Sequence, residues 1–392
     1  MTADQLVAPG AARRPAADRI PVMVPYLGEQ EAQAAADAVR SGWVAQGPRV
    51  AEFEQGFARR VAAAHGIALS SCTAALHLAM AACGIGPGDE VVVPSFSFIA
   101  TANAVRYVGA DPVFADVDAA TGNLTPATIT AVITPRTRAV ILVHQGGVPA
   151  DARAVAAAVR QFGIMVIEDA ACAAGASAHG EPVGAGALIA AWSFHPRKLL
   201  TTGEGGMLTL DRADWAARLR RLREHGMDVS ATDRHASAGP VFEHYLETGY
   251  NYRMTDVQAA VGLVQLGKLD AMVARRRELA TSYHELLDGV PGVRAVRDPA
   301  YGQGNYQSFW VLLDAEFPGG RDEALARLAA RGISARRGIM AAHLEPAYRD
   351  LPHAELPVTE RLTRDSLILP LFHTMTGEQQ RRVVDALLEP VR

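Results

Sequence analysis

Lysine is almost absent from this chain, and one of its two lysines lies in a segment suited to covalent chemistry. Of the 38 basic side chains, 36 are Arg, and the only Lys residues are Lys198 and Lys268. A lysine amine can lose its proton and attack a carbonyl carbon, whereas a guanidinium stays protonated in proteins. Lys198 is therefore a candidate nucleophile. Lys268 lies in VQLGKLD on an expected helix and is interpreted as an ordinary surface charge.

The residues around Lys198 favour that role. Lys198 ends the segment 193–198 (SFHPRK), which leaves an expected strand and is followed by the glycine-rich run 201–206 (TTGEGG). Glycines at this density allow the backbone to approach a ligand closely or to turn with positive φ. The GxxxxGKS/T spacing of a P-loop is absent, so this run is not a nucleotide-binding loop of that kind.

Three further segments follow expected strands and carry groups that suit a phosphorylated aromatic ligand. In residues 70–76 (SSCTAAL) a polar turn enters a helix whose free amides, with the Thr73 hydroxyl, would hold a phosphate. In residues 166–171 (VIEDAA) a carboxylate pair ends a buried strand, where Asp169 would need a cation such as a protonated ring nitrogen. Residues 94–98 (PSFSF) place aromatic side chains where a flat ring could stack.

Two of these segments also have plainer interpretations. The turn at 70–76 could be a simple helix N-cap, and Asp169 could cap a helix that follows its strand. The four segments taken together are more informative than any one of them alone. A phosphate-binding turn, an acid for a ring nitrogen, an aromatic that stacks and a strand-end lysine are together the requirements of pyridoxal 5'-phosphate (PLP). The sequence therefore predicts a PLP site.

The elements that must position these segments alternate between strand and helix. Seven short apolar runs, joined mostly through Ala-rich helical stretches, are candidate strands: 66–70, 90–94, 112–115, 138–144, 163–168, 188–194 and 207–210. This order predicts an α/β fold with a largely parallel seven-stranded sheet covered by helices on both faces. Ligands of such a sheet bind beyond the carboxyl ends of its strands, where all four segments lie.

Elements outside the sheet follow from helical periodicity and from glycine or proline breaks. A glycine-punctuated loop at 41–48 separates two expected helices, and a polar stretch at 228–240 is expected to be a mobile loop. The expected helices before and after the sheet are 29–40, 50–65 and a long, kinked or broken helix at 255–287. A smaller C-terminal α/β unit follows, with strands at 308–313 and 366–369 and helices at 321–331 and 377–388.

These patterns divide the chain into four parts. The expected parts are a disordered N-terminal tail at 1–19, a segment at 20–48 that packs with the small domain, a large PLP-binding domain at 49–265 and a small C-terminal domain at 266–392.

Composition excludes several classes of protein. The 392 residues are 49% hydrophobic with a net charge of -4, which argues against a surface for nucleic acid or anionic membrane. Cys72, Cys83 and Cys172 show no metal-binding spacing, which fits free thiols in a reducing compartment and predicts no metal site. The N-terminus lacks the apolar core of a signal peptide, and no apolar run reaches transmembrane length, so we expect a cytoplasmic protein.

Six segments together resemble the sugar aminotransferase family of the fold type I PLP-dependent enzymes. In chain order they are SGWVAQGP, SCTAALHLA, GDEVVVPSFSFIATANA, VIEDAACAAGA, SFHPRKLLTTGEGG and GYNYRMTDVQAA. The resemblance runs from about residue 20 to the C-terminus, and the lysine motif is its most specific part. It implies that Lys198 forms the Schiff base with PLP and that Asp169 pairs with the pyridinium nitrogen.

The same resemblance assigns the remaining cofactor contacts. It implies that the phosphate is held by Thr73, Ala74 and Ser193. Phe98 would stack on one face of the ring and Ala171 would pack on the other. Asn251 in GYNYR resembles an Asn that reaches the phosphate from the second subunit, which implies a homodimer with shared active sites.

Two cysteines depart from the family pattern. Cys172 stands where many members have Gln or His beside the phenolic oxygen of the cofactor, so that a weak thiol hydrogen bond replaces a good one. Cys72 replaces a common Gly in the phosphate turn. Four histidines have either a site or a structural interpretation: His195 and His225 near the cofactor, and His144 and His343 in a substrate pocket.

The expected function is PLP-dependent transamination of a keto sugar, carried by a nucleotide, with glutamate or glutamine as the implied amino donor. Alternatives are a cyclitol ketone aminotransferase, a PLP-dependent sugar dehydratase and a non-catalytic regulatory homologue. The dehydratases of this framework carry His at the lysine position, so Lys198 argues against that class. The presence of both Lys198 and Asp169 argues against a non-catalytic role. The sequence does not predict which sugar is used.

Overall fold

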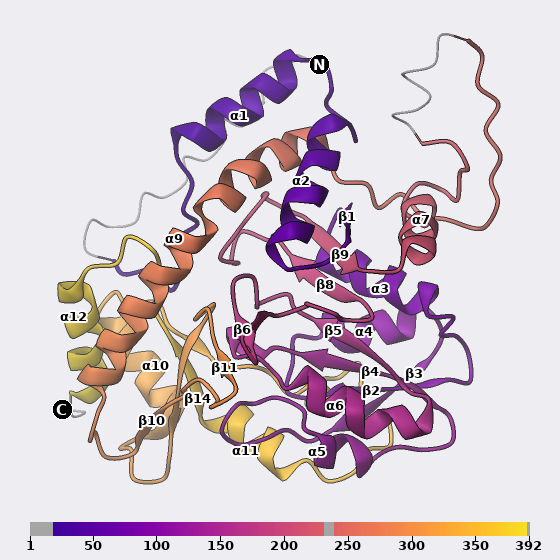
Figure 1. Ribbon diagram of the computed structural model, residues 1–392. Helices are drawn as coiled ribbons and strands as arrows, with labels where there is room; N and C mark the ends of the chain where they lie inside the picture. The colour runs from indigo at the N-terminus through magenta and orange to yellow at the C-terminus, as the bar shows by residue number, and fades with distance from the viewer. Residues whose placement is uncertain (1–18, 231–238, 390–392) are drawn as a thin grey trace, which may run out of the picture.

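The computed structural model describes residues 19–230 and 239–389 (Figure 1). The tail predicted at 1–19 lies outside these ranges except for Arg19, whose Nε and Nη2 donate to Ser334 Oγ at 3.2 and 3.0 Å. Most of the loop predicted at 228–240 also lies outside them.

Within the described residues, the predicted seven strands form one sheet in the order β1-β9-β8-β5-β4-β2-β3. Strand β9 runs antiparallel to both its neighbours, and the other neighbouring pairs are parallel, so the predicted fold class is confirmed. The strands are β1 (His65–Leu69), β2 (Glu90–Pro94), β3 (Asp111–Ala115), β4 (Thr137–Val143), β5 (Met165–Asp169), β8 (Ala190–Ser193) and β9 (Gly206–Leu210).

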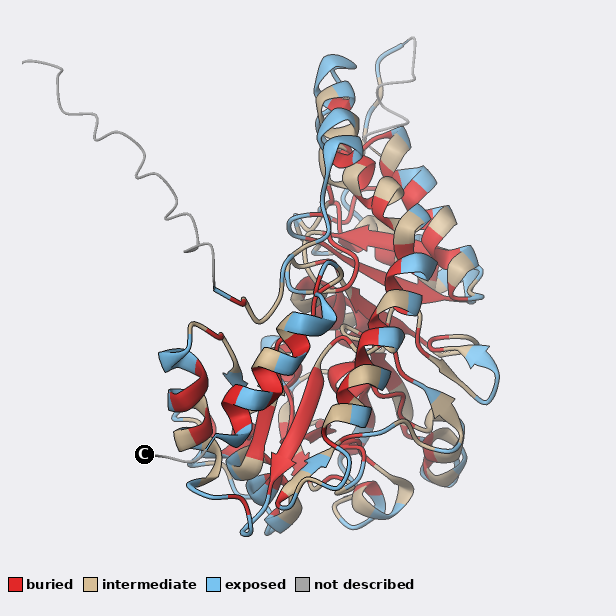
Figure 2. Cartoon of the chain, turned by 90° about the vertical axis from the view of Figure 1, so that its left-hand side faces the viewer, coloured by how far each residue is buried: buried red, intermediate tan, exposed pale blue. Residues whose placement is uncertain are grey.

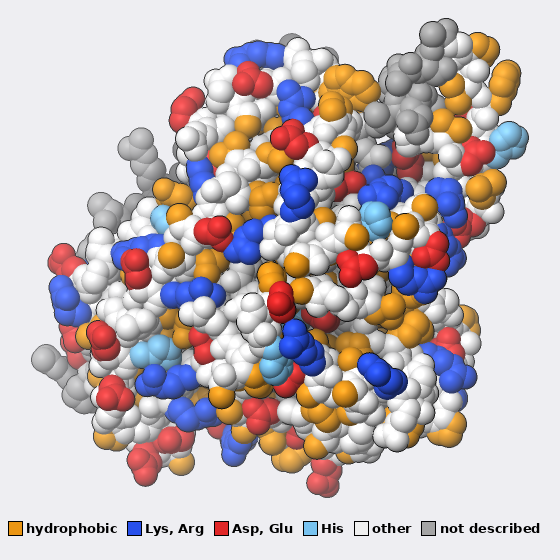
Figure 3. Space-filling view, in the orientation of Figure 1, with side chains coloured by type: hydrophobic (Ala, Val, Ile, Leu, Met, Phe, Trp, Pro, Cys, Tyr) orange, Lys and Arg blue, Asp and Glu red, His pale blue; other side chains and the backbone are white. Residues whose placement is uncertain are grey.

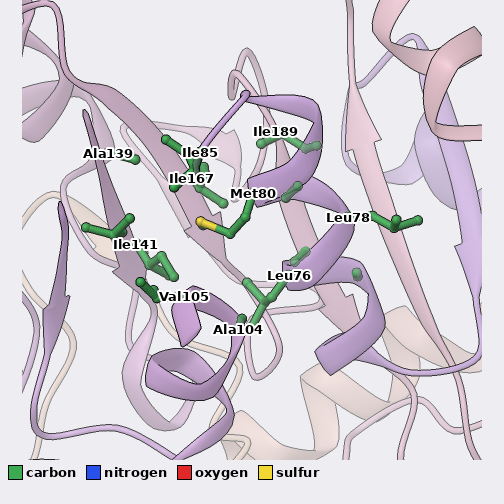
Figure 4. Packing of buried hydrophobic residues seen from close by; sticks show 14 of the residues in the cluster. Leu76, Leu78, Met80, Ile85, Ala104, Val105, Ala139, Ile141, Ile167 and Ile189 are labelled. Carbon is green, nitrogen blue, oxygen red and sulfur yellow. The ribbon is translucent and has the colours of Figure 1, made fainter. Parts of the chain in front are cut away.

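Helices cover both faces of this sheet because strands such as β2 (EVVVP) and β4 (TRAVILV) are apolar on both faces beyond their first one or two residues. On one face the buried side chains pack against α3 (Cys72–Ala82), α4 (Ala100–Tyr107) and α7 (Ala213–Leu222). Figure 4 shows Leu76 and Met80 of α3 among Ile141, Ile167 and Val105. The other face packs against α2 (Pro48–Arg60), α5 (Pro126–Thr130), α6 (Ala152–Val159) and α9 (Asp256–Leu286).

Helix α9 is one continuous helix of 31 residues, so a break is wrong, whereas a kink stays a prediction. Its first turn is fixed by a capping box between Thr255 and Gln258. Ala259 to Val273 pack in the core against β8, whereas Leu279 to Tyr283 pack in the C-terminal core. The domain boundary expected after residue 265 therefore falls inside a continuous helix and stays a prediction.

The same helix is long and apolar enough to cross a membrane, by length and composition alone. The sequence reading expected no run of that length. Figures 1 and 2 show α9 running diagonally along the molecule with buried residues on its inner side. Two cores share this helix, so burial on the protein explains its apolar character.

The C-terminal unit is an antiparallel sheet in the order β10-β12-β14-β13, covered by α10 (Gly320–Ala330), α11 (Pro357–Asp365) and α12 (Gly377–Leu388). Its strands are β10 (Val293–Ala295), β12 (Phe309–Leu313), β13 (Arg336–Arg337) and β14 (Ser366–Leu369). Ile20 is buried in this core and bridges to Ile333, whereas α1 (Glu29–Arg40) packs on α9. Short pieces complete the chain: β6 (Ser177–Ala178), β7 (Glu181–Pro182), β11 (Gly302–Gln303), and single 3-10 turns at Gln145–Gly147, Arg160–Phe162 and Ala342–Leu344.

Lys268 is not the ordinary surface charge expected from its sequence. Its Nζ lies 2.7 Å from Glu31 Oε1, and Gln265 Nε2 donates to the same oxygen at 2.8 Å. Glu31 is buried, and burial, which by itself raises its pKa, is outweighed by these bonds, so that its pKa is lowered. Lys268 therefore joins α1 to α9 through a partly buried ion pair.

Candidate active site

Lys198 lies in the turn that follows β8, at the carboxyl end of the sheet. Its amide donates to His195 O at 2.8 Å, and the next turn is held by Thr201 Oγ1, which donates to Phe194 O at 2.8 Å. The Lys198 Nζ lies 3.1 Å from Cys172 Sγ. Burial by itself lowers the pKa of Lys198, but the neighbouring Cys172, Cys72 and Asp169 outweigh it and raise that pKa.

Asp169 is the last residue of β5, the strand that pairs with β8. It is 5% exposed, and its Oδ2 accepts the Thr101 hydroxyl at 3.0 Å while Oδ1 accepts the Ala171 amide at 3.2 Å. Burial raises the pKa of this carboxyl against the lowering effect of the Ala171 amide and the Lys198 charge. Within the described residues no cation lies within ion-pair distance of Asp169.

The helix-cap interpretation of Asp169 is wrong. Residues 170–176 form successive turns rather than a helix, so Asp169 has no helix to cap. A buried carboxylate that accepts two hydrogen bonds but has no cationic partner is suited to the protonated ring nitrogen of PLP.

The phosphate-binding turn lies at the start of α3. Ser71 is the N-cap and its Oγ accepts the Ala74 amide at 3.1 Å, so the simple cap is also present. The first backbone bond of the helix runs from the Ala75 amide to Ser71 O at 3.0 Å, which leaves the Cys72 and Thr73 amides ahead of the helical ladder. These donors, at the positive end of the helix, suit a phosphate.

Gly206 brings Ser193 next to this turn. In the sheet, Gly206 of β9 pairs with Leu69 on one side and with Ser193 on the other. A Cβ at Gly206 would overlap the carbonyl group of Ser71, so only glycine lets α3 begin this close to β9. Thr73 and Ser193 are 120 residues apart in sequence. The close approach of α3 to β9 thereby places Thr73, Ala74 and Ser193 at the same end of the sheet.

Two aromatic residues follow β2, and the ring of only one of them is exposed. Phe96 is fully buried and packs on Trp310 with ring centroids 5.8 Å apart, whereas Phe98 is 70% exposed. Phe98 therefore retains a free face for a flat ring. The turn that carries Phe98 is linked to Asp169 through two hydroxyl groups. Thr101 Oγ1 donates to Asp169 and also lies 2.8 Å from Ser97 Oγ.

The two cysteines of the site have different surroundings. Burial, with a further contribution from the Asp169 charge, raises the pKa of Cys72 well above its usual value, so this thiol is neutral at physiological pH. Cys172 contacts Lys198 directly, and its backbone carbonyl accepts the Asn305 side chain at 2.8 Å. The sequence reading did not identify Asn305 or Thr101, since neither has a local pattern that predicts these contacts.

Two of the four candidate histidines are structural. His144 is 1% exposed; its Nδ1 accepts the Ala150 amide at 3.0 Å and its Nε2 lies 3.1 Å from Glu168 Oε2. His343 is also 1% exposed, and its Nδ1 lies 2.6 Å from Ser95 Oγ. Each of these ring nitrogens has a partner within the protein.

The other two histidines are more exposed. His195 is partly exposed three residues before Lys198, and the charges of Arg197 and Arg336 act on it. His225 lines a surface hollow with Tyr245 and Glu247, and the nearby Asn251 is exposed. Among the described contacts, none joins Asn251 to the group around Lys198.

The fold and this site define a PLP-dependent aminotransferase of fold type I, and comparison with known proteins gives its family. Residues 25–388 match the DegT/DnrJ/EryC1/StrS aminotransferase family, to which the chain belongs. The residues present fit the cofactor of this family: a strand-end lysine, a buried carboxylate without a cationic partner and helix amides for the phosphate.

Solved structures similar to this chain support the same conclusion. The aminotransferase TlmJ from Streptoalloteichus hindustanus is 36% identical, with a TM-score of 0.87 over 94% of this chain and 98% of TlmJ. DesI, solved in the presence of its TDP-sugar product, is 34% identical with a TM-score of 0.84 over 95% of this chain and 93% of DesI. Spr1654 from Streptococcus pneumoniae, solved in its PLP form, is 25% identical, with a TM-score of 0.87 over 94% of this chain and 98% of Spr1654.

Proposed function

We propose that this enzyme transfers an amino group from glutamate or glutamine to a keto sugar carried by a nucleoside diphosphate. The observation that carries the proposal is the contact of the strand-end Lys198 with Cys172 beside the buried Asp169. The TDP-sugar product of the similar DesI supports the class of acceptor.

Each residue of the site has a defined task in this reaction. PLP, when bound, supplies an electron sink that stabilises negative charge on the carbon bearing the amino group. Lys198 binds the cofactor and, when its Nζ is free, moves the proton to and from the substrate carbon. Asp169 keeps the proton on the ring nitrogen, and the Thr101 hydroxyl orients the Asp169 carboxylate. Thr73, Ala74 and Ser193 hold the phosphate, while Phe98 and Ala171 enclose the ring.

Two guanidiniums act on His195, in the turn that carries Lys198, which suits an anionic donor and a diphosphate-linked acceptor. Arg197 precedes Lys198 and Arg336 lies on β13, and both are exposed. The surrounding protein lowers the pKa of Arg336 by partial burial, and the charge of Arg197 lowers it further, so the two guanidiniums act on each other. Two cations that repel in the free protein are stabilised when a ligand with two negative charges binds between them.

We also place the enzyme in the cytoplasm as a homodimer in which Asn251 completes the site of the partner. The exposure of Asn251 and of Phe242, Tyr245 and Leu246 nearby supports a contact with a second copy. Figure 3 shows acidic and basic side chains interspersed on the face of the molecule that it presents, in line with the net charge of -4.

The substrate test uses mass detection of the aminated product. The purified enzyme is incubated with PLP, with glutamate or glutamine, and with a panel of nucleotide-linked keto sugars and cyclitol ketones. Amination of a nucleotide-linked sugar by the wild type but not by Lys198→Ala is the expected result. Amination of a cyclitol ketone alone, or of no ketone in the panel, would contradict the proposed acceptor.

A further inference from the structure

Lys198 is flanked by a glutamine from the C-terminal unit. Gln307 is 8% exposed and lies two residues before β12 of the small sheet. Its Oε1 accepts the Leu199 amide at 2.8 Å, and its Nε2 donates to Arg197 O at 2.6 Å. One side chain thus binds the peptide groups on both sides of Lys198, as a neighbouring strand would.

A second amide side chain holds the partner of Lys198. Asn305 is fully buried, and its Nδ2 donates to Cys172 O at 2.8 Å and to Ala174 O at 2.9 Å. Its Oδ1 accepts the Gln307 amide at 2.8 Å, so the two side chains are linked. We call Asn305 and Gln307 the amide clasp, because together they hold both turns that meet at the Lys198–Cys172 contact.

The amide clasp is itself fixed by α9 and by a glycine. Arg276, 2% exposed, donates from Nη1 to Tyr306 O at 2.9 Å, and burial lowers its pKa to about 10. Tyr306 has a φ of 50°, an uncommon conformation that this bond supports. A Cβ at Gly147 would overlap Asn305 Oδ1, so glycine is required where this loop meets the clasp.

We propose that Gln307 is a positioning residue for Lys198, and that with Asn305 it sets the place of the Lys198 amine relative to Cys172 and Asp169. The inference rests on the proposed role of Lys198. Glutamine suits this place because it offers one donor and one acceptor at the ends of one planar group, matching a carbonyl and an amide two residues apart. Without it, the buried Leu199 amide and the part-buried Arg197 carbonyl lose their partners, and the turn can shift.

Removal of the amide clasp should change the pKa of the Lys198 amine in a defined direction. Its neighbours Cys172, Cys72 and Asp169 hold its pKa above the ordinary value. A shifted turn separates the amine from them, so the pKa of Lys198 should fall whether the amine stays buried or reaches water. A deprotonated amine reacts faster with acylating reagents, so labelling of Lys198 at pH 9 should become faster.

The chain offers an internal standard for this measurement because Lys198 and Lys268 are its only lysines. Protein stripped of PLP is acylated with acetic anhydride between pH 7 and 11, and mass spectrometry of the two peptides gives the labelling of Lys198 relative to Lys268. We expect Gln307→Leu to raise this ratio at pH 9 by about threefold or more, and kcat to fall about tenfold or more at a nearly unchanged KM for the donor. Gln303→Leu, at an exposed site on β11, is the matched control and should change neither quantity.

Gln307→Glu distinguishes a positioning role of Gln307 from a packing role. It also provides the test if Gln307→Leu does not fold. Its ionised form cannot donate to Arg197 O, whereas its protonated form has the donor, the acceptor and the shape of glutamine. The defect in kcat, relative to the wild type at the same pH, should therefore shrink as pH falls from 8 to 5. A relative Lys198 labelling and a kcat both within twofold of the wild type in folded Gln307→Leu or Gln307→Glu would overturn the proposal.

The role of Lys198 is tested separately. Borohydride reduction of the wild-type holoenzyme should fix the cofactor to the Lys198 peptide. If the adduct is missing or lies on Lys268, the proposed function fails at its lysine. If the adduct is on Lys198 but the Gln307 variants behave as the wild type does, only the positioning role fails.

Discussion

Thr101 donates its hydroxyl hydrogen to Asp169 Oδ2 at 3.0 Å, and thereby joins the first turn of α4 to the end of β5. The pair is buried, since Thr101 is 2% and Asp169 5% exposed. The second carboxylate oxygen accepts the Ala171 amide at 3.2 Å, so the plane of the carboxylate is set by one donor from α4 and one from the turn after β5. A carboxylate fixed in this way can face one ring nitrogen in one orientation.

Asp169→Asn tests the charge of this group at nearly constant shape. The amide keeps the size of the side chain but cannot hold the ring nitrogen protonated, so kcat should fall by several orders of magnitude, or about 4 kcal/mol of barrier. Thr101→Val should have a smaller effect because the carboxylate remains charged. Steady-state kinetics with the best sugar acceptor measure both. Activity of Asp169→Asn within a few-fold of the wild type would show that the carboxylate has no role in catalysis.

Lys198→Arg conserves the charge and should still abolish turnover, because a guanidinium can neither bind the cofactor covalently nor move the proton. The visible absorbance of the bound cofactor should also disappear. Lys268→Arg is the control, since an arginine there can keep the ion pair with Glu31 and the activity. Equal loss in both variants would indicate a general defect rather than a catalytic one.

Mixed dimers test the shared site. Asn251→Asp places a carboxylate against the phosphate, a like-charge contact that should cost several kcal/mol in a partly dry site. When it is co-refolded with Lys198→Ala, about half of the dimers are mixed, and each mixed dimer has one intact site if Asn251 serves the partner. Roughly a quarter of wild-type activity should return. If differential tags confirm mixed dimers and the mixture stays inactive, Asn251 does not serve the opposite site.

Acid stability should depend on His284. Burial, with a further contribution from Arg297, lowers the pKa of this α9 side chain to about 4, and its ring packs against Phe309 with centroids 5.1 Å apart. The unfolded chain binds the proton near pH 6.5 and the folded chain does not, so the free energy of unfolding falls as pH falls from about 6.5 to 4.

His284→Phe removes this titration and should reduce the loss of Tm between pH 7 and pH 5. His353→Phe, at an exposed position beside His343, should change the pH dependence less than His284→Phe does. Thermal unfolding followed by circular dichroism at both pH values measures the difference. An unaltered pH dependence in His284→Phe would show that other groups set the acid limit.

The amino-acid sequence by itself determined the seven strands and the chemical nature of the site. Runs such as EVVVP and TRAVILV are apolar on both faces, and a parallel sheet collects their carboxyl ends, so Thr73, Asp169 and Lys198 could be placed at one edge from local pattern alone. The scarcity of lysine identified Lys198 without any structure.

Only the tertiary structure decided which polar residues hold that site in place. Gln307 lies 108 residues from Leu199, and Asn305 lies 133 residues from Cys172, so no periodicity or spacing connects them. The same holds for α9, whose apolar residues are shared between two cores, and for His144, which is fixed by Glu168 and the Ala150 amide. Local patterns reflect which groups leave water, whereas the partner that each buried polar group finds depends on how distant segments pack.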